Sequence, residues 1–250
     1  MSATTPAASK RILQFQPSAL RPREESERHY LEVHSPWAVR VFRDHPGLLA
    51  YHTNLVLGQW DIDGGFRRVP DLWRYATMRF GPEGGEFSAS VGRMLAHDHQ
   101  NFLRDLRRFD VTETVVLDRG TGQLSSDKYV VVVDRPERLD PRAAATALEE
   151  LVARVADAFA EQYGARRLVD NRVLREGENV ALAEPGQKPT GRTVEGSRRM
   201  AYLELYLDHQ VWGEELFAGP ALRGLLEDSP FAPDSVTAYH LAERAPHDRR

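Results

Sequence analysis

The chain has 250 residues, of which 41% are hydrophobic, and it carries a formal net charge of −4 and no cysteine. This balance gives no reason to expect a nucleic-acid partner, and the absence of thiols excludes disulfides, thiolate metal sites and cysteine nucleophiles. No apolar run approaches the ~20 residues that a membrane helix needs. Residues 1–9 lack the features of a signal peptide and have the composition of a disordered tail. We therefore expect a cytoplasmic protein with no membrane partner.

Hydrophobic periodicity predicts six elements in an N-terminal half that spans residues 10–122. In chain order they are a strand at 10–16, a helix at 18–44, strands at 48–57 and 72–80, a helix at 88–109 and a strand at 111–117. The order β-α-β-β-α-β is that of a ferredoxin-like unit.

The same order repeats in residues 128–243, although few residue identities do. The predicted elements are a strand at 129–133, a helix at 141–163 capped by Asp140, strands at 167–174 and 200–208, a helix at 209–226 and a strand at 236–242. We therefore expect an α+β fold in which two tandem ferredoxin-like units form an α/β barrel. One open antiparallel sheet with helices on one face is the alternative.

A long segment at 176–199 interrupts the second half. It is rich in Gly and Pro and has no stable periodicity. Segments of this length inside a compact domain are usually functional or inserted. Two interpretations stay open, a flexible hairpin insertion and a lid over a substrate.

Three motifs of the first half occur in the order found in one protein family. RHYLEVHSPW contains an aromatic residue, Tyr30, before a His-small-Pro triplet that starts at His34, and PGLLAYHTNLV follows with Tyr51 and Asn54. AHDHQNFLRDL places Asp98 four positions before a Phe. The first 120 residues thus resemble EthD-type proteins of the dimeric α/β-barrel superfamily.

The resemblance implies a ferredoxin-like sheet that pairs with a second such sheet to enclose a small-molecule cavity. In a relative with a single unit the second sheet comes from another chain, whereas here the second half could supply it. Relatives include dehydratases and cyclases of aromatic polyketides and cofactor-free oxygenases. Fold alone does not select among these activities, and a homodimer stays open as an assembly.

Histidines point to proton transfer, because imidazole exchanges protons near neutral pH. His34 is the predicted general acid or base, and the family triplet strengthens that role. His52 and Asn54 share one face of the strand at 48–57, where they could hold a phenol or enolate oxygen. Tyr30 and Trp37 lie on the same helix as His34 and are predicted to contact substrate. His52 and Asn54 are expected to converge with Trp73, Tyr75 and Arg79 on one cavity, and His34 is expected to be reached from the mouth of that cavity.

Alternation on the strand at 72–80 places Trp73, Tyr75 and Arg79 on one face. In the second half Tyr202, Glu204 and Tyr206 occupy the corresponding face. Such faces suit a flat, oxygenated ring system inside a barrel. A wet subunit interface would produce the same pattern.

No cofactor or metal is expected from the sequence. His97 and His99 diverge on a helix, and His29 and His34 are five residues apart, off the spacing that zinc helices use. Motifs for nucleotides, serine hydrolases and haem ligation are missing as well.

The first functional hypothesis is therefore a cofactor-independent enzyme that performs proton transfer on a hydrophobic, oxygenated small molecule. Dehydration or cyclisation of a polyketide intermediate is the most natural example. A cofactor-free oxygenase acting on a similar substrate and a non-catalytic small-molecule-binding or assembly protein are the alternatives.

Overall fold

A computed structural model describes residues 9–61, 65–68, 72–82, 84–85, 87–120, 127–177, 179–181, 190–192, 197–232 and 234–248. The predicted N-terminal tail falls almost wholly outside these residues. None of the described helices combines the length and the apolar character needed to cross a membrane.

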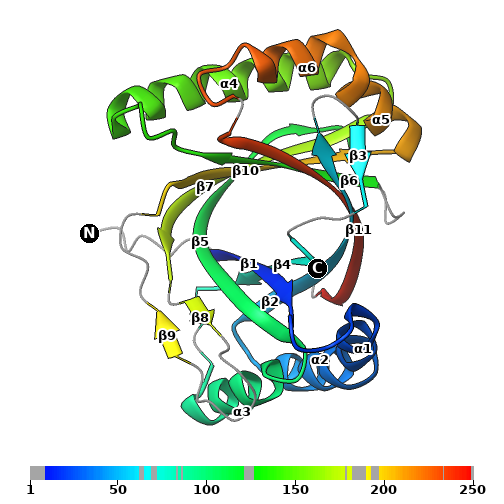
Figure 1. Cartoon of the computed structure of the whole chain (residues 1–250), viewed down its shortest axis with the longest axis vertical. Helices are drawn as coiled ribbons and strands as arrows, with labels where there is room; N and C mark the ends of the chain where they lie inside the picture. The colour runs from blue at the N-terminus through cyan, green and yellow to red at the C-terminus, as the bar shows by residue number, and fades with distance from the viewer. Residues whose placement is uncertain are drawn as a thin grey trace.

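Eight antiparallel strands close into a barrel, in the order β1-β4-β2-β11-β6-β10-β7-β5 and back to β1 (Figure 1). Their bounds are Ser9–Pro17 (β1), Leu48–Asp61 (β2), Arg74–Phe80 (β4), Leu103–Asp118 (β5), Asp127–Asp134 (β6), Ala165–Glu176 (β7), Arg199–Leu207 (β10) and Val236–Asp248 (β11). The predicted α+β class and the predicted barrel are confirmed, and the single open sheet is excluded because β1 pairs with β5.

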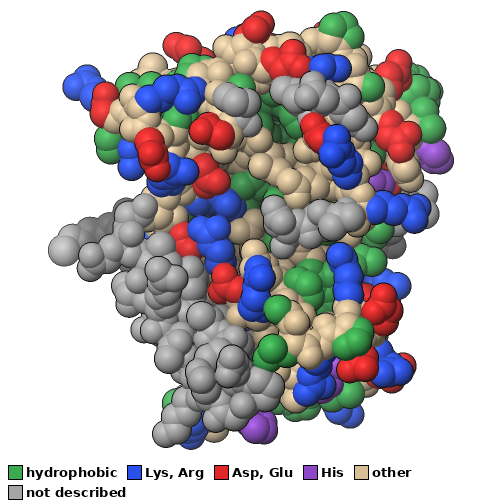
Figure 2. Space-filling model, in the orientation of Figure 1, with side chains coloured by type: hydrophobic (Ala, Val, Ile, Leu, Met, Phe, Trp, Pro, Cys, Tyr) green, Lys and Arg blue, Asp and Glu red, His purple; other side chains and the backbone are tan. Residues whose placement is uncertain are grey.

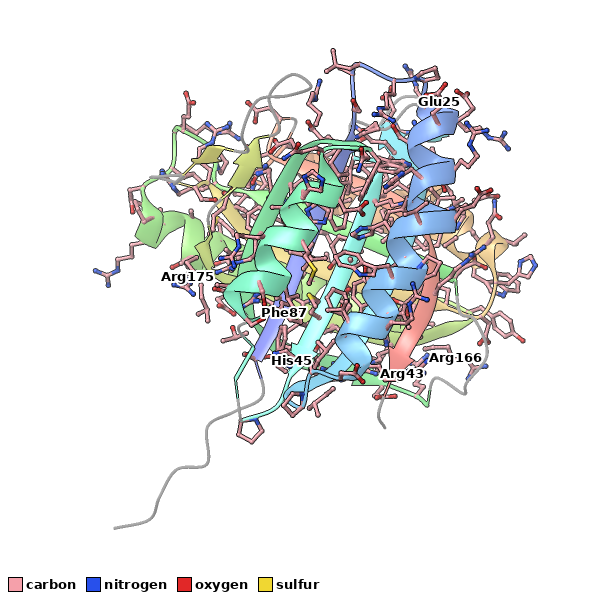
Figure 3. All side chains as sticks on the ribbon, turned by 90° about the horizontal axis from the view of Figure 1, so that it is seen from below. Glu25, Arg43, His45, Phe87, Arg166 and Arg175 are labelled. Atoms are coloured by element: carbon pink, nitrogen blue, oxygen red, sulfur yellow. The ribbon has the colours of Figure 1, made fainter. Side chains whose placement is uncertain are left out.

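Helices of the first half cover one side of the barrel (Figure 1). They are α1 (Arg23–His29), a π-helical turn η1 (Tyr30–His34), α2 (Ser35–Arg43) and α3 (Ala89–His99). Seen from below, the α1–α2 helix and α3 lie side by side across the strands, with Glu25 at one end of the former and Arg43 at the other (Figure 3).

Helices of the second half cover the opposite side (Figure 1). They are α4 (Pro141–Glu161), α5 (Gln210–Ala218) and α6 (Pro220–Glu227). Asp140 caps α4 as predicted, since its carboxylate accepts hydrogen bonds from the backbone N–H groups of Arg142 and Ala143. The helix predicted at 209–226 is interrupted at Gly219, because Pro220 cannot donate a backbone hydrogen bond and begins a new helix.

Three hydrophobic clusters follow from this layering. One lies between the barrel and α4–α6, one between the barrel and α1–α3, and one inside the barrel around Ile12, Tyr75 and Tyr202. Each strand therefore has a helix-facing side and an interior side, which is the reason for its alternating sequence.

Two predicted helices of the first half differ from the structure. The helix predicted at 18–44 begins at Arg23 and ends at Arg43, and a π-helical turn at Tyr30–His34 interrupts its α-helical geometry. Residues 103–109 belong to β5 and not to the second helix, because the chain there pairs with β1. Leu103, Leu106 and Phe109 have helical spacing, but long-range pairing overrides this local pattern.

A hairpin occupies part of the segment 176–199. Its strands β8 (Asn179–Ala181) and β9 (Thr190–Arg192) pair with each other, and β8 extends the sheet from β5. The hairpin part of the insertion hypothesis is confirmed, and the remaining residues of the segment lie largely outside the described ranges. A further short strand, β3 (Gly65–Arg67), pairs with β2.

Candidate functional site

The predicted site residues fall in two places, separated by the thickness of the sheet. Seven lie inside the barrel: His52, Asn54, Tyr75, Arg79, Tyr202, Glu204 and Tyr206. The others, His34, Tyr30, Trp37 and Trp73, lie in the layer of α1–α3. Of the five residues expected to converge on one cavity, four lie on the interior side, and the prediction is wrong for Trp73, which lies on the other side of the sheet.

Charged groups inside the barrel bond to one another. Glu204 is 1% exposed, and its carboxylate accepts hydrogen bonds from Lys10 Nζ at 2.7 Å and from Tyr75 OH at 3.0 Å. Lys128 Nζ lies 2.9 Å from the same carboxylate, and Asn171 Nδ2 donates to it at 3.3 Å. Two lysine charges hold the pKa of Glu204 well below its usual value, although burial alone would raise it.

The two lysines extend this contact into an alternating chain of charges. Lys10 Nζ also bonds Glu113 at 2.6 Å, and Glu113 in turn pairs with Arg79. Lys128 Nζ bonds Glu243 at 2.6 Å, and His52 Nδ1 lies 3.6 Å from that carboxylate. Charged groups predicted to line a substrate pocket therefore bond to one another and link the strands of the barrel. Within the described residues, Asn54 Oδ1 and Asn171 Oδ1 are buried inside the barrel without a hydrogen-bond partner.

Asn54 is also inside the barrel, fully buried, where its Nδ2 donates to the backbone oxygen of Tyr75 at 3.1 Å. The predicted register of β2 and of β10 is thus confirmed. His52 and Asn54 nevertheless face away from His34, because side chains on the helix-facing side of the sheet cannot share a cavity with those on its interior side.

His34 forms the centre of the second cluster. It is 3% exposed, and its Nδ1 lies 2.7 Å from Asp98 Oδ2, which joins η1 to α3. His29 Nε2 lies 2.8 Å from the other oxygen of Asp98. The described residues supply no hydrogen-bond partner for His34 Nε2, and this atom is not among the fully buried unpartnered ones. Within the described residues, only Nδ1 of this imidazole is held by a carboxylate.

The π-helical turn explains how two histidines reach one carboxylate. Residues five apart diverge on a regular α-helix, but the backbone N–H of Ser35 donates to the carbonyl of Tyr30, five residues earlier. The wider turn brings His29 and His34 onto the same side. Pro36, which lacks an N–H, follows at once in α2. A spacing of five residues is off the pattern of zinc helices, but the π turn lets this pair share a carboxylate partner.

The charges around Asp98 favour its ionised form. Burial alone would raise the pKa of Asp98, but hydrogen bonds and charge from His34 and His29 lower it to about 2. His99 lies behind the pair, with its ring centroid 5.1 Å from that of His34. Burial, reinforced by the neighbouring His34, lowers the pKa of His99 to about 3, so His99 is neutral at pH 7. The cluster thus combines the ionised carboxylate of Asp98, the His34 imidazole that it orients, and the neutral His99 imidazole behind His34.

A groove of about 560 Å³ opens directly beside this pair, between α2 and α3. Its lining residues are Val33, Trp37, Ser90, Arg93, Met94, His97 and Asp98. Val33 and Met94 are 50% and 47% exposed, which is unusual for large apolar side chains. The groove therefore combines an apolar wall with the carboxylate that orients His34.

Trp73 belongs to the helix-facing side, against the prediction that it shares a face with Tyr75. It lies just before β4 begins, where alternation is not yet established, and its Nε1 donates to Glu27 at 2.8 Å. The next residue, Arg74, also pairs with Glu27 and stacks its guanidinium 3.8 Å from the centroid of the Tyr30 ring. Tyr30 thus lies between the Arg74 pair and His34.

Asp98 and Arg74 were missed as site residues by sequence reasoning. Asp98 had a usable signal, because its motif follows the His34 motif in the expected family order. Arg74 had none, since an arginine at the start of a strand is usually solvated. Among the described residues no group of His, Asp and Glu is arranged to hold a metal ion.

Comparison with known proteins gives a fold but no sequence family. No family model matches the chain, and no curated protein does. A candidate monooxygenase from Lactobacillus acidophilus aligns over 97% of this chain and 96% of its own, with a TM-score of 0.51 and 10% identity. A candidate monooxygenase from Fusobacterium nucleatum covers 94% and 92%, with a TM-score of 0.53 and 7% identity.

The chain shares the overall fold of these two structures. A chlorite dismutase from Candidatus Nitrospira defluvii aligns over 94% of this chain and 91% of its own at 9% identity, but its TM-score of 0.46 is too low to support an argument. Identities this low establish architecture and leave the activity to the site.

Proposed function

We propose that this protein is a small-molecule enzyme that works by general acid–base catalysis, with His34 as the proton-transfer residue and Asp98 as the residue that positions it. The single observation that supports this most is the 2.7 Å contact between His34 Nδ1 and Asp98 at the edge of an apolar groove. A carboxylate on one ring nitrogen fixes the tautomer and leaves the other nitrogen to exchange a proton.

A difference between the two helical layers favours this location. The buried residues of α4, α5 and α6 are all apolar or glycine. Those of α1, η1 and α3 include Ser26, His34 and His99. Burying polar groups costs free energy unless they are well paired, so their concentration in one layer calls for a reason beyond stability.

The EthD resemblance supports the same assignment. Residues of two of its motifs gather around His34: the ring of Phe102 lies 4.8 Å and that of Tyr30 lies 5.4 Å from the imidazole, and Asp98 binds it. We infer an EthD-like protein that acts on a hydrophobic, oxygenated molecule, for which dehydration or cyclisation of a polyketide is the natural reaction class.

We also infer that the chain consists of two tandem ferredoxin-like units. The strand orders β5-β1-β4-β2 and β11-β6-β10-β7 correspond element by element. The two halves also carry the same residue type at equivalent strand positions, as in Lys10 and Lys128, Asn54 and Asn171, and Glu113 and Glu243. For example, Asn54 lies opposite Glu243 just as Asn171 lies opposite Glu113.

A cofactor-free oxygenase is the second candidate. Two structures with a similar fold carry the description monooxygenase, and this favours the oxygenase candidate. Their sequence identity to this chain is low and supports a shared fold only. An oxygenase of this kind would use the same oriented imidazole to deprotonate a substrate that then reacts with O₂. The two candidates differ only in whether turnover needs O₂.

Turnover of candidate polyketides, measured with and without O₂, tests both candidates. His34→Gln should lower kcat by about 10²-fold or more, the usual contribution of one positioned acid–base group. Asp98→Asn should also lower kcat, and it should move the pH profile because the imidazole loses its anionic partner. His209→Gln is the control, since His209 lies at the start of α5 in the other layer. A fully active His34→Gln protein would exclude the proposal.

A further inference from the structure

The groove beside His34 has a basic wall as well as an apolar one. Arg93 and His97 are four residues apart on α3, so they lie on the same side of that helix, and both line the groove. Val33 on η1 and Trp37 on α2 also line it. No carboxylate partner of Arg93 occurs among the residues that the structure describes.

The carboxylate of Asp98 lines the same groove but makes no ion pair with Arg93 among the described residues. Its two oxygens are already engaged by His29 and His34, at 2.8 Å and 2.7 Å. A guanidinium without a carboxylate next to an indole is a site for a planar anion, since guanidinium binds carboxylates in a fork geometry and the ring offers a flat apolar surface.

We propose that the groove binds a planar aromatic molecule that carries an anionic oxygen group, with Arg93 as its charge-recognising residue and Trp37 as its stacking surface. A volume of about 560 Å³ falls within the range of small-molecule pockets, which is ~300–1,000 Å³. This inference rests on the proposed function, because it names the substrate class of the same site.

The orientation that follows is chemically useful. An aromatic body lies against Trp37 and Val33, and its anionic group meets Arg93 and His97. The rest of the ring system then faces Asp98 and the His34 that it positions. The ring of Trp37 lies 6.2 Å from that of His34, centroid to centroid, so a molecule stacked on the indole is adjacent to the imidazole.

Binding of 2-naphthoate and of neutral 2-naphthamide, measured by calorimetry, tests the proposal. The wild-type protein should bind the anion more tightly, and Arg93→Gln should remove about two- to fivefold of that preference, the size of an exposed ion pair. Trp37→Ala should weaken both ligands. Arg154→Gln is the control, because Arg154 is exposed on α4, in the other helical layer.

Equal affinity of the wild-type protein for the two ligands would overturn the proposal, as would an equal effect of Arg154→Gln and Arg93→Gln. The result is independent of catalysis, because His34→Gln should bind naphthoate like the wild-type protein. Charge-selective binding without any His34-dependent turnover would refute the proposed function alone. Turnover that depends on His34 without charge selectivity would refute this inference alone.

Discussion

Replacement of Glu204 by Gln tests how the barrel interior is stabilised. Gln has nearly the same shape, so the change removes a charge and leaves the volume almost unaltered. It also turns one carboxylate oxygen into an N–H₂ group, which faces either Lys10 or Lys128. Both ammonium groups are buried, and each keeps one other carboxylate partner, Glu113 or Glu243. The interior is left with one cation in excess.

Breaking a buried ion pair by removing one partner usually costs about 3–5 kcal/mol, because the remaining charge stays desolvated. Glu204 has two such partners within 2.9 Å and is 1% exposed, so the upper part of that range is expected. A domain is stabilised by only about 5–15 kcal/mol in total. The variant should therefore lose a large fraction of its stability and can fail to fold at 37 °C.

Urea denaturation at pH 7 measures the effect as a lower midpoint at an unchanged slope. Asp208→Asn is the control, because it breaks the Arg166–Asp208 pair, whose side chains are each 40% exposed, and it should leave the midpoint within error. Adding Lys128→Met to Glu204→Gln removes the excess cation and should restore part of the loss. A single variant within about 1 kcal/mol of the wild type would show that water, rather than Glu204, compensates the lysines.

Three further results are expected. The pKa of the buried His99 is about 3 in the folded state and near 6.5 in the unfolded state. The stability contributed by neutral His99 is therefore complete above pH 6.5, and it falls by about 1.4 kcal/mol per pH unit between these two values. Chemical denaturation should find a smaller slope in His99→Gln. Gly213→Ala places a Cβ 2.1 Å from the buried Tyr129 ring and should cost about 1–3 kcal/mol, whereas Gly224→Ala has open space and should cost nothing in the same urea titrations. Trp73→Ala should lower the free energy of unfolding by about 3–5 kcal/mol, since the indole is fully buried under the helices. A smaller loss would support the original prediction that Trp73 contacts a ligand.

Strand faces were predictable because burial repeats every second residue. Alternation placed Asn54 and Glu204 inside the barrel and Leu203 under the helices, as the structure has them. The same logic failed at Trp73, which precedes the first regular residue of β4. Alternation identifies a face only where the ladder of hydrogen bonds is continuous.

The interior charges were not predictable from local sequence. A lysine within a strand usually lies at a wet surface, and Lys10 and Glu204 are separated by 194 residues. Only the closure of the barrel brings such distant groups together. The His34–Asp98 contact has the same origin, because the two motifs were recognised separately while their contact depends on how η1 and α3 pack. Acidic and basic side chains are also mixed over the visible surface, so net charge alone would not have revealed either cluster (Figure 2).

Strand β4 connects the two clusters and separates their roles. Arg74 faces the helical layer and contacts Tyr30 beside His34, while the next residue, Tyr75, faces the interior and donates to Glu204. Because the charged groups of the interior bond to one another, we expect the barrel to act mainly as a support and the proposed acid–base chemistry to lie in the outer layer. Stability and function should therefore separate experimentally. A Glu204 variant that still folds should retain the affinity of the groove, whereas His34→Gln should lose turnover without losing stability.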